Sequence, residues 1–249
     1  MENSSILIVV MVVSLTAGVI HSAIGFGFGI VAISLLPLAI DAKSSHIIVS
    51  VCSVPMLLMA AWTYRKGAQV LPLVVASAGA ILAIPAGLIL FEAASMDLLV
   101  RLTGLGVLLM VASSLRPQKK DIRHHPATNS HLPSFVAGVI SGFLAGAVSI
   151  AGPPIAAYAI RQNWKTNQYK AFVTQFLLVV ATAKAILLGF RDHIDTELGI
   201  EIGVASILSV VGVAIGERLS RNLQAEKLKH IVAAALITVA FLMLIGGSK

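Results

Sequence analysis

Two apolar stretches are each interrupted by glycine or proline, and these interruptions contain the residues best suited to bind a ligand. Proline removes a backbone donor and clashes with the preceding helical turn, and glycine weakens a helix further. Each stretch is therefore predicted to form two helical segments with a break between them. The interrupting residues are Gly25, Gly27 and Gly29 in the stretch 15–33, and Gly152, Pro153 and Pro154 in the stretch 134–160.

A helix that restarts inside an apolar stretch offers a site for an anion. Its first turn has unpaired N–H groups and a partial positive charge, which is the arrangement that binds phosphate and sulfate. Glycine lets a ligand approach the backbone closely because no side chain intervenes. The two breaks therefore predict an anion site near the bilayer midplane. The alternative is that the glycines only allow helices to pack.

Three polar side chains lie close to the breaks. His21 lies four residues before Gly25 and is expected to face the first break, where it could donate to an anion or carry a proton. Ser22 and Ser149 flank the two breaks, and a hydroxyl group beside free N–H groups suits an oxyanion. The alternative for His21 is a hydrogen-bonded histidine that only packs.

Further candidates lie on the spans that follow the breaks. Lys184 is a cation well inside an apolar run and could attract an anion, or its ammonium group could reach the membrane surface. Ser50 and Gln175 could orient a ligand or link neighbouring helices. His46 lies at the start of a span and is expected to be interfacial.

The acidic residues argue against several functions by their positions. All 11 aspartates and glutamates lie in loops or at span ends. Because an intramembrane carboxylate marks most cation and proton pathways, a cation substrate is disfavoured. The spans contain no HExxH motif, paired aspartates or Ser/Lys constellation, so we expect no enzyme, metal or cofactor.

Composition places most of the chain inside a membrane. The 249 residues are 57% hydrophobic and 12% charged, with a mean hydropathy of +0.94. Apolar runs long enough to cross a hydrocarbon core of about 30 Å recur along the whole length. The net charge of +7 does not indicate nucleic acid, because the basic residues lie in short loops, as cytoplasmic loops do.

The chain is predicted to contain two repeats. Ala83, Gly87 and Asp97 correspond to Gly212, Gly216 and Glu226 at one constant spacing, and AGVI occurs at 17–20 and again at 137–140. The first repeat, 1–115, is expected to contain a re-entrant hairpin at 6–40 and spans at 47–64, 70–91 and 98–115. A basic cytoplasmic linker covers 116–133. The second repeat, 134–249, is expected to contain a hairpin at 134–160 and spans at 172–190, 198–215 and 231–245.

The basic residues favour hairpins over full crossings. If both interrupted stretches fold back to the side they left, most loop lysines and arginines gather on one face, whereas two crossing stretches would divide them almost evenly. A hairpin plus three spans per half requires the halves to be inverted. The predicted fold is therefore an all-α polytopic membrane protein with two inverted repeats, each a re-entrant helical hairpin plus three transmembrane helices, and with both termini outside.

The run SGFLAGAVSIAGPPIAAYAI at 141–160, together with HSAIGFGFGIVAI at 21–33, resembles the TauE/SafE (TSUP) family of sulfite and sulfonate exporters. The resemblance covers nearly the whole chain. It implies a permease of the bacterial inner (cytoplasmic) membrane that exports small sulfur-containing anions such as sulfite, sulfoacetate and related organosulfonates. The sequence departs from the commonest family form at Ser149-Ile150-Ala151, where glycines and valine are frequent.

The residues and the resemblance together predict a carrier with alternating access, in which the hairpins hold the anion. The sulfur substrate and the export direction come only from the resemblance. A transporter of another organic anion, such as a carboxylate, and an anion channel remain open as alternatives. The expected partners are a small anionic substrate and the lipid bilayer, without nucleic acid, and a homodimer is compatible with the sequence.

Overall fold

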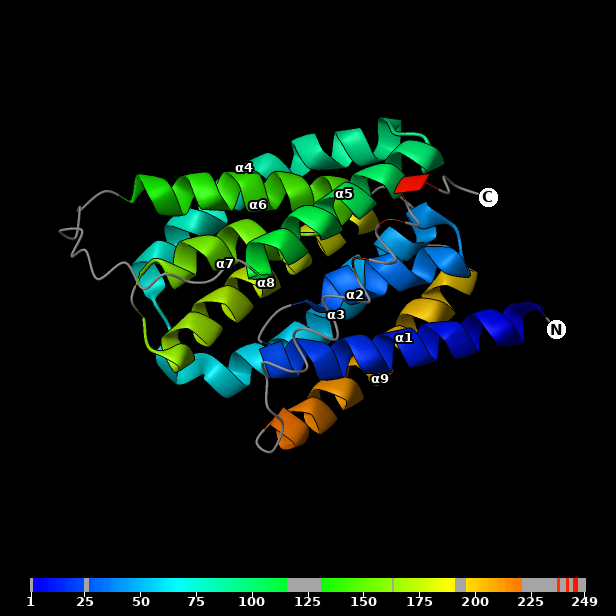
Figure 1. Cartoon of the computed structure of the whole chain (residues 1–249), viewed down its shortest axis with the longest axis horizontal. Helices are drawn as coiled ribbons and strands as arrows, with labels where there is room; N and C mark the ends of the chain where they lie inside the picture. Colours follow the sequence, from blue (N-terminus) through cyan, green and yellow to red (C-terminus); the bar gives the residue numbers. More distant parts are fainter. Residues whose placement is uncertain are drawn as a thin grey trace.

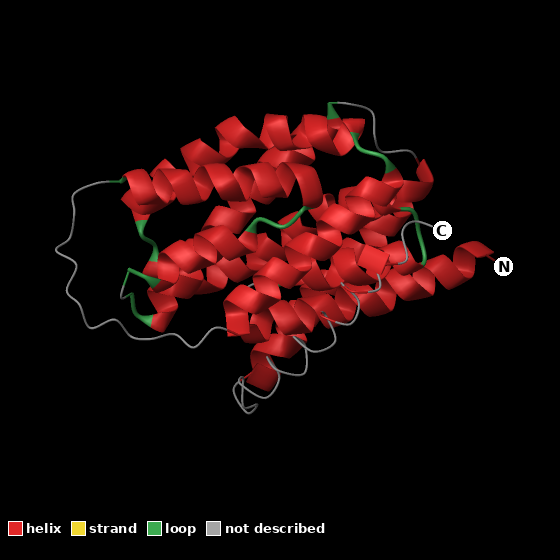
Figure 2. Ribbon diagram, turned by 45° about the horizontal axis from the view of Figure 1, so that its top comes forward, coloured by secondary structure: helices red, strands yellow, loops and turns green. Residues whose placement is uncertain are grey.

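The computed structural model describes residues 2–24, 27–115, 131–162, 164–190 and 196–220, with residues 237, 241, 244 and 245. Within these residues every regular element is helical (Figure 2). Gly25, most of the predicted linker and most of the predicted span 231–245 lie outside them. The elements are α1 (Glu2–Ile24), α2 (Phe28–Leu35), η1 (Leu36–Leu38), α3 (Ala42–Tyr64), η2 (Arg65–Gly67), α4 (Val70–Ala93), α5 (Met96–Leu115), α6 (Leu132–Val148), α7 (Gly152–Ile160), α8 (Thr166–Gly189) and α9 (Thr196–Ser220).

Five of the described helices are long and apolar enough to cross a membrane: α1, α3, α4, α8 and α9. Large apolar side chains cover their outer surfaces, with Leu82 on α4 72% exposed and Ile207 on α9 64% exposed. An exposed apolar surface of this kind fits lipid rather than water. The molecule is thus a multi-pass α-helical membrane protein.

Two of these helices begin earlier than hydropathy predicts because their first turns are polar and capped. α3 begins at Ala42, where the Asp41 carboxylate accepts a hydrogen bond of 2.9 Å from the Ser44 amide. α8 begins at Thr166, where the Gln168 side chain accepts a hydrogen bond of 2.9 Å from the Lys165 amide. A hydropathy pattern does not register such turns, although capping residues favour them.

Both interrupted stretches break where glycine or proline predicts. α1 ends at Ile24 and α2 begins at Phe28, with Gly27 at φ 112°. α6 ends at Val148, and the next helix, α7, begins at Gly152. The end of α6 is an αL cap, in which the Ser149 amide donates to the Ala145 carbonyl at 3.1 Å. Ser149 has φ 56° and occupies the left-handed position that glycine usually takes.

The arms of each interrupted stretch are unequal, whereas the sequence analysis expected pairs of half-helices. α1 has 23 residues and α6 has 17, but α2 has 8 and α7 has 9. At 1.5 Å per residue, α1 is about 34 Å long and can cross a bilayer by itself. Gly18 is the one glycine before Gly25 in this stretch, and α1 continues through it because it packs against Gly212 of α9.

Two pairs of helices pack with their backbones in contact. α4 lies along α6, where Gly138 meets Ala76 and Gly146 meets Ile84. α1 lies along α9, where Gly18 meets Gly212 and Gly216 meets Val19. In each pair the contacts advance together along both chains, so the paired helices run in the same direction. Small residues allow this close approach.

The helix directions bring each interrupted stretch back to the end from which it started (Figure 1). α1 and α3 both begin near the end of the molecule that carries the N-terminus, so α2 leads the chain back between them. α6 and α8 both begin at the opposite end, and α7 leads back between them. At that opposite end Gly67 touches Asn167, and the Lys170 ammonium lies 5.3 Å from the centre of the Tyr64 ring.

Candidate functional site

The two helix breaks, far apart in the sequence, touch each other inside the molecule. A β-carbon at Gly29, in the first turn of α2, would lie 3.0 Å from the carbonyl oxygen of Ser149, at the end of α6. Any larger residue at this position would push the two backbones apart by a few tenths of an ångström or more. The contact joins the break of the first half of the chain to the break of the second.

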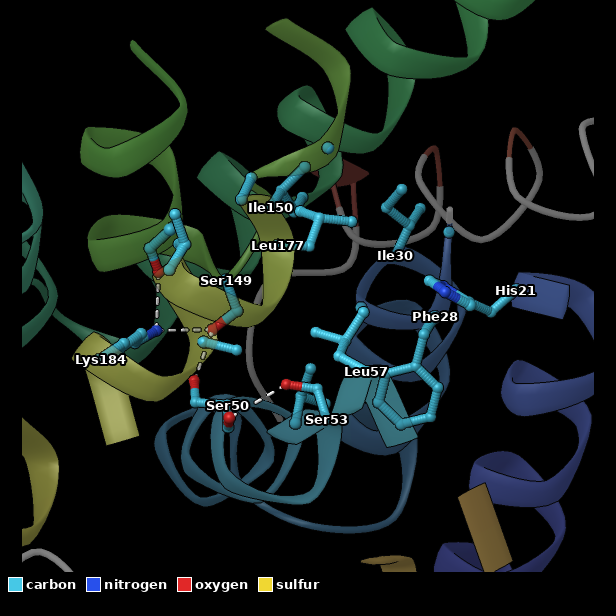
Figure 3. A pocket seen from close by; sticks show the side chains of 18 of the residues that line it. His21, Phe28, Ile30, Ser50, Ser53, Leu57, Ser149, Ile150, Leu177 and Lys184 are labelled. Atoms are coloured by element: carbon cyan, nitrogen blue, oxygen red, sulfur yellow. Dashed lines mark hydrogen bonds between the residues drawn. The ribbon is translucent and has the colours of Figure 1, made fainter. Parts of the chain in front are cut away.

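A cavity of about 80 Å³ lies beside this contact, between α1, α2, α3, α8 and the α6–α7 break (Figure 3). One water needs about 10–15 Å³ of such volume, so the cavity can hold several waters or a small anion. Seven of the residues singled out in the sequence line it. They are His21, Gly27, Gly29, Ser50, Ser149, Gly152 and Lys184.

Other candidates from the sequence do not line the cavity. Ser22 lies on the face of α1 that packs against Gly216 of α9. Pro153 and Pro154 form the first turn of α7, and Gln175 lies on α8, all outside the lining. Proximity in sequence to a break therefore did not decide which side chains face the cavity, because a helix turns neighbouring residues to different sides.

Lys184 is a buried cation at the edge of the cavity. Its side chain is 3% exposed, and its ammonium group donates to the Ala145 carbonyl at 2.8 Å and to the Ser149 hydroxyl at 2.7 Å. The ammonium does not reach the membrane surface, because the carbonyl and hydroxyl groups at the end of α6 hold it inside. Across the described part of the chain, no carboxylate forms an ion pair with it. An isolated buried charge is costly, so this arrangement favours a negative partner.

Ser149, Lys184, His46 and Ser50 form a polar cluster with the Ser149 hydroxyl at its centre. Besides Lys184, it lies 3.0 Å from His46 Nδ1, 3.3 Å from the Ser50 hydroxyl and 3.4 Å from the His46 carbonyl. Ser50 donates its own proton to that carbonyl at 2.6 Å. A hydroxyl has one proton and two lone pairs, so these neighbours engage the full capacity of Ser149. The bonds help to hold the left-handed backbone at this residue.

His46 corrects an expectation from the sequence, which placed it at the membrane interface. It is 1% exposed, and Nε2 lies 3.2 Å from the Thr103 hydroxyl of α5. Its ring meets Phe91 edge-on at 5.7 Å. The reason is that the polar first turn places His46 in the second turn of α3, facing inward. Its spacing of four residues from Ser50 was the available signal, since both then lie on one helix face.

His21 lies at the other side of the cavity from the polar cluster, with apolar side chains between them (Figure 3). It is 2% exposed, and its Nδ1 has no hydrogen-bond partner among the described residues. Buried polar atoms are nearly always paired in native proteins. His21 can therefore offer a hydrogen bond to a ligand in the cavity.

The two breaks differ in the amide groups that they can offer. In α2, Ile30 and Val31 donate to the Gly27 carbonyl at 3.1 and 3.0 Å, which leaves the preceding amides of Phe28 and Gly29 without an acceptor in their own helix. In α7, Pro153 and Pro154 have no amide hydrogen. Free backbone donors therefore belong mainly to the first break, whereas the second contributes the side chain of Ser149.

Comparison with known proteins then identifies the family. The family model described as sulfite exporter TauE/SafE matches residues 10–243 of the 249. Searches of curated proteins and of solved structures find no significant match to the chain. The matched range includes both helix breaks and every side chain of the polar cluster. The chain belongs to the sulfite exporter TauE/SafE family, whose members are membrane transporters and not enzymes.

Proposed function

We propose that this protein exports small sulfur anions, such as sulfite or organosulfonates, across the bacterial inner membrane by alternating access. The anion would lie in the cavity between the polar cluster and the first turn of α2. The observation that carries the proposal is the buried ammonium group of Lys184, which faces the cavity without an ion-pair partner among the described carboxylates.

The donors around the cavity suit an oxyanion. An ammonium group has three N–H donors, and two of those on Lys184 already bond to Ala145 and Ser149. The third can donate to an anion, whose charge would neutralise the lysine. The amides of Phe28 and Gly29 and the His21 ring can supply further hydrogen bonds. Hydrogen bonds to a charged acceptor are stronger than those between neutral groups.

The helix directions support two inverted repeats, each opening with a re-entrant hairpin. α1 and α6 run in opposite directions, and each packs along a helix of the other half: α1 along α9, and α6 along α4. The same pairing therefore occurs twice with the halves exchanged. Transporters built in this way bind substrate where the repeats meet, and they expose it by moving one half against the other.

The positions of the basic turns support a cytoplasmic linker. The Arg65–Gly67 turn and the start of α8 lie at one end of the bundle, because Gly67 touches Asn167. Lys43, at the start of α3, lies at the other end, where it donates to the Glu92 carbonyl at 3.3 Å. The positive-inside rule would place the first end in the cytoplasm. An inside-negative membrane potential then favours anion exit by about 2.3 kcal/mol per charge per 100 mV.

The test is to replace Lys184 by methionine and to measure sulfite binding and flux. Lys184→Met should abolish the sulfite-induced thermal shift in detergent and reduce flux in proteoliposomes by at least about tenfold, because the buried charge is lost. Lys170→Met is the matched control, since Lys170 lies on the same helix beside Tyr64 and outside the cavity. Full sulfite binding and flux in Lys184→Met would contradict the proposal.

Two alternatives can be separated in the same system. A carboxylate transporter would bind lactate more tightly than sulfite. An anion channel, which a re-entrant loop can form, would give flux that rises with concentration without saturation. Saturable flux and competition by sulfonates rather than by lactate would support the proposed exporter.

A further inference from the structure

The charge of the cavity limits the charge of its ligand. Among the described residues that line it, Lys184 is the one with an ammonium group. The titratable groups nearby are His21 on α1 and His46 on α3, and imidazoles are mostly uncharged above a pH of about 6.5. The neighbouring groups from α5 and α4 are the Thr103 hydroxyl and the Phe91 ring, which carry no charge. The site therefore presents a single positive charge.

The wall opposite this charge is apolar. Phe28, Leu57 and Leu177 line the cavity between the polar cluster and His21 (Figure 3). Met56 and Val180 add to this wall and are both almost fully buried. A second charged group on a ligand would lie against these side chains without a counter-ion, which is costly in a buried site. An uncharged or apolar remainder would instead be buried favourably.

We infer that the protein selects singly charged sulfur oxyanions whose remaining atoms are uncharged. The inference rests on the proposed function and narrows its substrate class. Methanesulfonate and hydrogensulfite, the singly protonated form of sulfite, meet the condition. Sulfate and the sulfite dianion carry one negative charge more than Lys184 can neutralise. Sulfoacetate and taurine have the right head group, but they place a second charged group against the apolar wall.

The experiment compares four sulfur compounds on the full-length protein in detergent at a pH of about 7, above the ordinary pKa of a free imidazole. Dissociation constants are measured by calorimetry for methanesulfonate, sulfate, sulfoacetate and taurine. Methanesulfonate should bind at least about tenfold more tightly than each of the other three, because it alone carries one negative charge for the Lys184 ammonium and no further charged group. Sulfate binding as tight as methanesulfonate binding would overturn the inference, while the proposed anion site would survive.

A variant with a second cation gives an independent test. Leu177 lies two helical turns before Lys184 on α8, and both line the cavity. Leu177→Lys should lower the dissociation constant of sulfate, relative to that of methanesulfonate, by at least about tenfold. The matched control Leu177→Met should still bind methanesulfonate more tightly than sulfate. An unchanged order in folded Leu177→Lys would contradict the inference.

The two proposals fail in different ways. If none of the four compounds binds to the wild-type protein, methanesulfonate included, the selectivity is refuted. If sulfite also gives no thermal shift, the proposed function fails with it. If all four bind with similar dissociation constants, the anion site stands and only the selectivity is refuted. If Leu177→Lys does not fold, the dissociation constants of the four compounds with the wild-type protein decide the selectivity by themselves.

Discussion

At the scale of single residues, Ser149 combines an unusual backbone with a central position in the polar cluster. It is the one non-glycine residue with a positive φ in the described part of the chain, at 56°. A residue with a side chain pays about 1–2 kcal/mol to adopt the left-handed conformation. The hydroxyl compensates through its contacts with Lys184, His46 and Ser50.

Two substitutions at this position separate backbone strain from binding. Ser149→Gly and Ser149→Ala both remove the hydroxyl and should weaken sulfite binding to a similar extent. Glycine adopts the left-handed conformation without strain. The free energy of unfolding of Ser149→Gly should therefore be about 1 kcal/mol higher than that of Ser149→Ala. Thermal and denaturant unfolding in detergent measures the difference. Equal stability of the two variants would show that the backbone here is not strained.

At the scale of helices, the molecule uses glycine for two different purposes. Gly27 has φ 112° with open space around it, so its backbone conformation requires glycine. Gly29 has ordinary space on most sides but lies against the Ser149 carbonyl, so the contact between the breaks requires it. The glycines of α4, α6 and α1 serve helix packing instead, as do Gly212 and Gly216 of α9. Glycine-rich breaks and glycine-rich helix faces therefore have separate roles.

A larger residue at Gly29 should separate the two breaks without unfolding the bundle. Gly29→Val would place its side chain against the Ser149 carbonyl, 3.0 Å from the new β-carbon. Sulfite flux should be lost, while the protein should remain in the membrane, because the α1–α9 and α4–α6 contacts are untouched. Gly203→Val on α9 is the control, since no atom lies within 4 Å of a β-carbon there. Normal flux in Gly29→Val would mean that contact between the breaks is not needed for transport.

At the scale of the whole molecule, the interrupted stretches determine which ends of the helices share a side of the membrane. α3 and the η2 turn lead from Lys43 at one end to Lys66 at the other, over about 34 Å. In the proposed re-entrant arrangement, Lys66 and the start of α8 share one side of the membrane, because Gly67 touches Asn167. The polar cluster and the cavity lie among buried residues inside the bundle.

Cysteine labelling tests this arrangement. Lys43→Cys and Lys66→Cys, each made in a Cys52→Ala background, should react with a membrane-impermeant maleimide from opposite faces. Cys52 is the one cysteine of the sequence and is buried, so its replacement removes background reaction. Lys66→Cys should be labelled only after the cytoplasmic face is exposed. Labelling of both positions from one face would refute the proposed topology.

The amino-acid sequence by itself determined the membrane class, the family and the positions of both helix breaks. Hydropathy, glycine and proline act locally, so their effects can be read from neighbouring residues. The tertiary structure decided which side chains meet. Ser149 contacts Lys184 35 residues away and His46 103 residues away, and both contacts depend on how α3, α6 and α8 pack. For the same reason the sequence placed His46 at the membrane interface, and it did not show that Ser22 and Gln175 lie outside the cavity lining, since packing decides the rotation of each helix about its axis.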